Sequence, residues 1–257
     1  MSIKTTVASS FSMIGESVVL CCKRPYLFLY KLIPIATPVI LIFLADIDRM
    51  FDLVLHHRPV MMAVFYALIA LNILFTVYLA RRTLYLIHTT QSTPHLVRHT
   101  TLLLHTIVWA ALIIAGMFVF SQMTQWVYLS VKNPSITKWT ESYPTLIQHG
   151  VPSLLLLLTL LWNFTTLVPA IIGTEWVSLQ TAIRRSCSTI GKHFFTFLTI
   201  WMFFAGIDLL PIAIPLAIPR HYPLLKQILP YALQLIIATL NTVTYCVFYH
   251  RYKEDIL

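Results

Sequence analysis

Residues 59–80, PVMMAVFYALIALNILFTVYLA, carry no charged side chain over more than 20 positions. About 20 predominantly apolar residues are what an α-helix needs to cross the hydrocarbon core of a bilayer. Residues 150–172 and 228–249 are uncharged over a similar length. These three stretches predict a polytopic membrane protein.

Three further apolar stretches complete a set of six predicted spans. One has Lys31 near its start, and another contains Asp208. We expect Lys31 to extend along its helix and place its ammonium group at the lipid headgroups. The sequence thus predicts one all-α membrane domain over residues 1–257, with spans near 25–45, 59–80, 101–125, 150–172, 194–218 and 228–249.

Composition agrees with this interpretation. The chain is 58% hydrophobic and 11% charged, whereas soluble domains are roughly 45–50% apolar and about 25% charged. The surplus of apolar residues lies in the predicted spans.

The distribution of lysine and arginine predicts the orientation. With six spans, one side of the membrane holds twelve of these residues and the other side holds six. Since cytoplasmic loops are enriched in Lys and Arg, both termini are expected in the cytoplasm. The net charge of +9 then reflects topology and attraction to anionic lipid headgroups on that side. The chain has no nucleic-acid-binding motif, and we expect no nucleic-acid partner.

Two segments have the pattern of amphipathic helices that lie in the membrane interface. Residues 5–22 carry Val7, Phe11, Ile14, Val18 and Cys21 at helical spacing. Residues 175–190 repeat the pattern with Trp176, Leu179, Ile183, Cys187 and Ile190. Their similarity leaves an internal repeat open as a second explanation, because transporters often contain one.

The stretch from Pro169 to Glu175, followed by Ala-Ile-Arg184-Arg185-Ser186, resembles the signature of a bacterial family of six-helix inner-membrane proteins. That family includes the membrane domain fused to some glycerophosphodiester phosphodiesterases. The resemblance implies a location in the bacterial inner membrane. It implies no phosphodiesterase activity, because the soluble catalytic domain with its acidic metal ligands is absent from this sequence.

Asp208 is the one carboxylate inside a predicted span. An ionisable group at such depth is costly and is by default a functional hypothesis. Four prolines follow at every fourth position, from Pro211 to Pro223, and they predict a kinked or broken helix. Asn163 and Asn241 are candidate partners in a ligand or proton site. The structural alternative is that Asp208 is satisfied locally and the prolines shape the exit to the outer loop.

A metal site receives weak support. Asp48, Asp52 and His56 share a helical face at i, i+4 spacing, and carboxylate with imidazole can ligate zinc. A solvated polar loop explains the same residues. We expect no cofactor, since the chain has only six glycines and no phosphate-binding loop or catalytic triad order.

The sequence therefore predicts an integral inner-membrane protein without catalytic activity. The favoured role is to bind or help to move a lipid or a small amphipathic molecule. The alternative is a membrane scaffold or assembly factor, with a second copy of the chain or another membrane protein as partner. Transport requires a cavity that reaches Asp208, whereas a scaffold requires exposed small residues such as Ala111 and Ala115.

The topology can be tested with reporter fusions. Fusions at the N-terminus and after Leu257 should both report the cytoplasm, and a fusion at Asn133 should report the outer side, because the charge bias favours this orientation. An external signal from either terminus would rule out the six-span arrangement.

Overall fold

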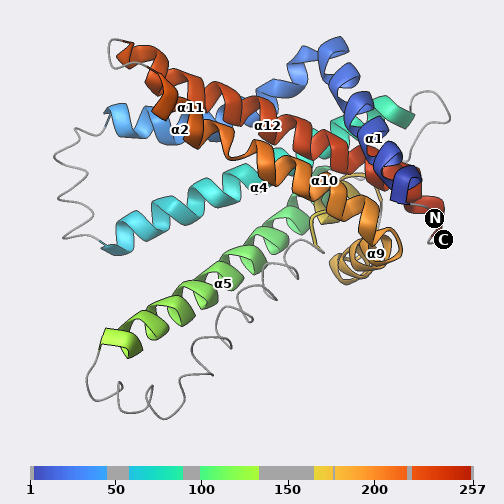
Figure 1. Ribbon diagram of the computed structural model, residues 1–257. Coiled ribbons are helices and arrows are strands. Elements are labelled where there is room, and N and C mark those ends of the chain that lie inside the picture. The colour runs from blue at the N-terminus through green and yellow to red at the C-terminus, as the bar shows by residue number, and fades with distance from the viewer. Residues whose placement is uncertain are drawn as a thin grey trace.

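The computed structural model describes residues 3–44, 58–88, 99–132, 165–175, 177–218 and 222–255 (Figure 1). Within these ranges the chain is helical and contains no strand. The elements are α1 (Ile3–Lys23), η1 (Pro25–Phe28), α2 (Leu29–Leu44), α4 (Arg58–His88), α5 (His99–Lys132), α8 (Val168–Thr174), α9 (Leu179–Lys192), α10 (Phe194–Ile207), α11 (Leu210–Ala217), α12 (Pro223–Tyr252) and η3 (Lys253–Asp255).

The all-helical fold is confirmed for the described residues, among which four segments are long and apolar enough to cross a membrane. Three of them, Tyr66–Ile87, Phe194–Ile214 and Ile228–Tyr252, fall on predicted spans. The fourth, Thr5–Lys23, coincides with the segment that the sequence predicts to lie in the interface. Helices α2 and α5 overlap two more predicted spans. Of the predicted span 150–172, only the part from Thr165 onward lies in the described residues.

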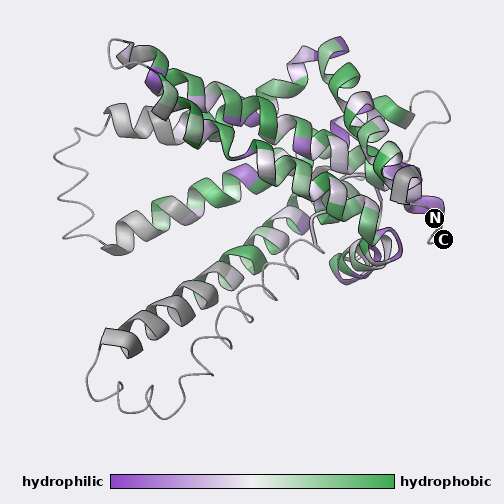
Figure 2. Cartoon of the chain, viewed as in Figure 1, coloured by the Kyte–Doolittle hydropathy of each residue, from purple (hydrophilic) through white to green (hydrophobic). Residues whose placement is uncertain are grey.

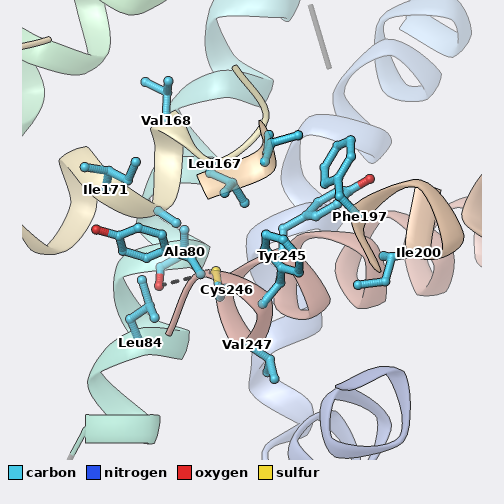
Figure 3. Packing of buried hydrophobic residues seen from close by; sticks show 14 of the residues in the cluster. Ala80, Leu84, Leu167, Val168, Ile171, Phe197, Ile200, Tyr245, Cys246 and Val247 are labelled. Carbon is cyan, nitrogen blue, oxygen red and sulfur yellow. Dashed lines mark hydrogen bonds between the residues drawn. The ribbon is translucent and has the colours of Figure 1, made fainter. Parts of the chain in front are cut away.

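The packed core lies where α4, α8, α10 and α12 meet (Figure 3). Leu84 of α4 and Ile171 of α8 are buried there with Phe197 of α10 and Phe248 of α12. The Cys246 thiol lies 3.9 Å from the Ala80 carbonyl oxygen, across α12 and α4. This contact requires close packing of the two helices.

Glycine allows a second close approach. A Cβ atom at Gly173 would lie 3.3 Å from the backbone nitrogen and the Cβ of Arg81. Any larger residue would therefore push the end of α8 away from α4, the helix against which α8 packs.

Several buried hydroxyl groups are satisfied within their own helices. Ser17 Oγ donates to the carbonyl oxygen of Met13 at 2.7 Å, and Thr106 Oγ1 donates to that of Leu102 at 2.7 Å. Such i−4 bonds let hydroxyl side chains lie in apolar surroundings without a separate partner. The same bond is made by Ser10, Thr37, Thr76, Thr189, Thr199, Thr239, Thr242 and Thr244.

The helix break predicted from the prolines is present. Helix α10 ends at Ile207, and α11 begins at Leu210 with Pro211 in its first turn. Pro211 has no N–H to donate to the carbonyl four residues earlier, and its ring clashes with that carbonyl. Asp208 is the C-terminal capping residue of α10 at this break.

Helix α1 packs against the C-terminal part of α12 (Figure 1). Ser9 lies 3.2 Å from the Tyr252 hydroxyl, and Glu16 forms an ion pair with Arg251. Two consecutive residues of α12 thus reach positions seven residues apart on α1. Phe11 meets Phe203 of α10 edge to face at 5.8 Å between ring centroids.

The residues of the predicted apolar stripe of α1 are divided between the protein interior and its surface. Ile14 and Cys21 are buried, whereas Phe11 is 52% exposed and Val18 is 40% exposed. Ser17 is also buried, and its hydroxyl donates to the carbonyl oxygen of Met13. Small hydroxyl residues let α1 approach α10 and α12 closely, which favours them over larger apolar residues at the contact.

Polar residues gather at one end of the described structure. Hydrophilic positions are concentrated around α9 and the chain termini, whereas most of α10 and α12 is hydrophobic (Figure 2). This is the distribution expected of a bundle with one end at a charged membrane surface.

The amphipathic pattern of α1 predicts its depth in a bilayer. Phe11 and Val18 are about 10 Å apart along the helix axis at 1.5 Å per residue. Spin labels at these two positions should report the same shallow depth, because an amphipathic helix of this kind lies in the plane of the interface. A depth difference near the full axial separation would show instead that α1 crosses the membrane.

Candidate functional site

The ammonium group of Lys31 is buried between α2 and α4. The residue is 6% exposed. Its Nζ donates to Asn72 Oδ1 at 3.1 Å and to Thr76 Oγ1. The Thr76 hydroxyl in turn donates to the backbone oxygen of Asn72 at 2.6 Å. We call these three residues the Lys31 cluster.

Local sequence explains how the cluster forms. Asn72 and Thr76 are four residues apart and so lie on one face of α4. Lys31 is in the first turn of α2, which packs against α4. A small buried apolar cluster that contains Leu27, Leu79 and Val243 joins η1, α4 and α12.

The Lys31 amine lies inside the bundle and not at the headgroups. Thr76 is about 8 Å along α4 from Arg81, and Asn72 is about 14 Å from it, at 1.5 Å per residue. Since Arg81 and Arg82 mark the charged end of α4, the amine bonds to groups well inside the apolar stretch. The prediction that Lys31 extends to the headgroups is therefore wrong, because polar side chains of α4 attract its amine inward.

The charge of the cluster is not balanced by the described residues. Both groups that bond the amine are neutral, and no carboxylate in the described ranges forms an ion pair with it. An ammonium group has three N–H donors, of which two bond to described residues. Asn72 is itself an exposed residue. An anionic group that reaches this point would find a positive charge.

A second polar cluster ties three elements together at the charged end of the bundle. Glu175 follows α8 in extended conformation and forms an ion pair with Arg185 of α9. Its other carboxylate oxygen accepts a hydrogen bond from the Tyr249 hydroxyl of α12. Glu175 and Arg185 side chains are 24% and 29% exposed. We call this set the Glu175 cluster.

Helix α9 begins later than predicted. The predicted helix 175–190 is wrong at its start, because α9 runs from Leu179. Ser178 is its N-cap, and its Oγ accepts a hydrogen bond from the Thr181 backbone N–H at 3.2 Å. This cap leaves Glu175 outside the helix and free to bridge α9 and α12.

The other residues of the bacterial-family motif have structural positions. Pro169 lies in the first turn of α8, where its missing N–H costs no helical bond. Ser186 is buried on the face of α9 toward the bundle, and Arg184 is exposed on the opposite side. The motif thus serves to join α8, α9 and α12.

Within the described residues, no contact joins Asp208 to Asn241, one of the residues predicted to form a site with it. Asp208 is exposed at the end of α10; its backbone N–H donates to the Phe204 carbonyl oxygen at 2.8 Å, and its carboxylate makes no hydrogen bond or ion pair within the described ranges. Asn241 is half-buried on α12, and its Oδ1 has no hydrogen-bond partner there. Asn163 lies outside the described residues, as do Asp48, Asp52 and His56.

The described side chains offer little for metal or redox chemistry. They contain no group of three His, Cys, Asp or Glu residues that could hold a metal ion. All four cysteines are free thiols. Burial raises the pKa of the Cys187 thiol on α9, so this group stays protonated at neutral pH and is a poor nucleophile.

The pairing of Lys31 with Asn72 and Thr76 was not predicted from the sequence. The i, i+4 spacing of Asn72 and Thr76 inside an uncharged span was the available signal. The register between α2 and α4 brings Lys31 beside Asn72 and Thr76. This register cannot be inferred from the sequence of either helix alone.

No family model, curated protein or solved structure matches this chain. The resemblance to the six-helix bacterial family therefore stays a prediction.

The Glu175 cluster predicts a measurable contribution to stability. Glu175→Gln keeps an acceptor for Tyr249 but removes the ion pair with Arg185, and it should lower the free energy of unfolding in micelles by about 1–3 kcal/mol. Glu254→Gln, which removes an exposed carboxylate of η3, should change it by less than about 0.5 kcal/mol. Equal effects of the two variants would contradict a bridging role for Glu175.

Proposed function

We propose that the protein is an integral membrane protein, without catalytic activity, that binds and helps to move an amphipathic molecule with an anionic head. A lipid with a phosphate or carboxylate group is the simplest such molecule. The Lys31 cluster would hold the head, and the apolar surfaces of α2 and α4 would contact the chains.

One observation carries this proposal, namely a buried ammonium group bonded only to neutral groups of the described chain. A charge inside a membrane is costly and is usually paired or functional. A neutral polar residue could also join the two helices by hydrogen bonds, and its burial would cost less desolvation energy than the burial of an ammonium group. An anionic ligand would supply the missing countercharge.

The proposed setting is a six-span arrangement in a bacterial inner membrane with both termini in the cytoplasm. Helices α1 and α9 would lie in the interface on the cytoplasmic side. The exposed charges of Lys23, Arg82, Arg184 and Lys192 would face anionic headgroups there. These headgroups would also concentrate anionic lipids near α2 and α4.

Lipid binding by the purified protein tests the proposal. Native mass spectrometry of the detergent-solubilised protein should show tighter binding of phosphatidic acid than of phosphatidylcholine with the same chains. Lys31→Gln should weaken phosphatidic acid binding roughly 10- to 100-fold, because a hydrogen bond to a charged group is worth about 1.5–3 kcal/mol. Glutamine can still donate to Asn72 and Thr76, so the fold should be retained.

Lys23→Gln is the matched control, because Lys23 is an exposed lysine at the end of α1. It should leave phosphatidic acid binding within about twofold of the unmodified protein, since an exposed charge contributes little. Equal binding by Lys31→Gln and the unmodified protein, at equal thermal stability, would rule out Lys31 as the anchor.

A scaffold or assembly role is the second candidate function. It is favoured by α5, on which Ala111 and Ala115 are exposed as that role requires. A groove of about 380 Å³ lies between α4 and α5 and is lined by apolar residues such as Ala67, Ala70 and Ala110. Small residues of this kind allow close helix packing in membranes.

A further inference from the structure

A small crevice lies between α1, α4 and α12 at the charged end of the bundle. Within the described part of the chain its volume is about 170 Å³. Its lining residues are Glu16, Leu20, Ile87, Val247, His250 and Arg251. Sites for drug-sized ligands measure about 300–1,000 Å³, so this crevice has room for a small chemical group only. We call it the Glu16 crevice.

The crevice lies at the end of two predicted spans. The segments Tyr66–Ile87 of α4 and Ile228–Tyr252 of α12 are long and apolar enough to cross a membrane, and both end beside it. Helix α1 packs against the same end of α12 (Figure 1). With α4 and α12 crossing the bilayer, a group in the crevice lies among the lipid headgroups, outside the hydrocarbon core.

The crevice presents both signs of charge. Glu16 of α1 and Arg251 of α12 form an ion pair, and their side chains are still 51% and 33% exposed. Ser12 Oγ donates to the same carboxylate oxygen, Oε1, at 3.1 Å. Both hydrogen bonds that the Glu16 carboxylate makes within the described residues therefore end on one oxygen, and Oε2 accepts none there.

Apolar side chains complete the lining. Leu20 is four residues from Glu16 on α1, and Val247 is four residues from Arg251 on α12. Residues at this spacing share a helix face, so each helix supplies one charged and one apolar group to the crevice. Ile87 adds a third apolar group from α4.

An exposed ion pair of this kind favours a ligand with two charges. A ligand with one charge is attracted by one member of the pair and repelled by the other at nearly the same distance, so the two effects largely cancel. A zwitterion placed in the opposite sense meets both charges favourably. Phosphoethanolamine is a zwitterion of this size, because a primary ammonium group has three N–H donors for a carboxylate and a guanidinium group binds phosphate.

We propose that the Glu16 crevice binds the phosphoethanolamine head of a membrane lipid. The ammonium group bonds to Glu16, the phosphate bonds to Arg251, and the apolar lining contacts the lipid next to its head. Phosphatidylcholine fits less well, because its quaternary ammonium group has no N–H to donate. This proposal is independent of the Lys31 cluster and requires only that α4 and α12 cross the bilayer.

Native mass spectrometry of the full chain in detergent measures this preference. The probes are dioleoyl phosphatidylethanolamine and dioleoyl phosphatidylcholine, which have the same chains. We expect phosphatidylethanolamine to bind about tenfold more tightly, because only its ammonium group donates a hydrogen bond to the carboxylate. Glycerophosphoethanolamine, which has the same head without chains, should displace little of the lipid at equal concentration, because it lacks the apolar contact.

Two variants assign the preference to the Glu16 crevice. Glu16→Gln should lower phosphatidylethanolamine binding to the level of phosphatidylcholine, whose binding should not change. Arg251→Gln should weaken binding of both lipids, because both contain the phosphate. Each variant removes the same ion pair, so a purely structural role would affect the two lipids equally in both variants. Glu254→Gln is the control and should leave the preference unchanged, because Glu254 does not line the crevice.

Three results would overturn the proposal. Equal binding of the two lipids would mean that the crevice does not recognise the ammonium group. A preference for phosphatidylethanolamine that persists in Glu16→Gln would place the site elsewhere. Efficient displacement of the lipid by glycerophosphoethanolamine would assign the crevice to a soluble ligand.

Discussion

Lipid chains offer no hydrogen bonds, so each polar group inside the membrane must find its partner within the protein. This constraint accounts for much of the described structure. Hydroxyl groups such as those of Ser17 and Thr106 bond to carbonyl groups of their own helix. At the charged end, Glu175 is satisfied by Arg185 and Tyr249 together. The helices can then pack through apolar contacts, because these hydroxyl and carboxylate groups already have hydrogen-bond partners.

The same constraint makes two charged groups stand out. Lys31 is buried with neutral partners only, and Asp208 is exposed on an apolar surface without a partner in the described ranges. The two groups have opposite charge and occupy different helices. The sequence predicted a ligand or proton site at Asp208, whereas our proposal for an anionic ligand rests on Lys31.

Much of the fold follows from composition, because an uncharged stretch such as 59–80 has few alternatives to a helix. The break before Pro211 is equally local in origin and was predicted. The start of α9 was predicted too early. The apolar periodicity extends back to Trp176, but the Ser178 cap starts the helix at Leu179. The partners of Lys31 and Glu175 depend on how helices far apart in the chain align. Such alignment is set by side-chain packing between helices. The apolar periodicity within one helix does not reveal this packing.

The burial of the Lys31 amine is the central claim, and solid-state NMR of the protein in bilayers tests it directly. With ¹⁵N-labelled lysine and ¹³C-labelled asparagine, the Lys31 Nζ signal is assigned by its loss in Lys31→Gln. The structure predicts a dipolar contact between this nitrogen and the Asn72 side-chain carbon, and slow exchange of the amine with D₂O. A Lys31 signal that lacks this contact and exchanges as fast as that of the exposed Lys23 would contradict the account.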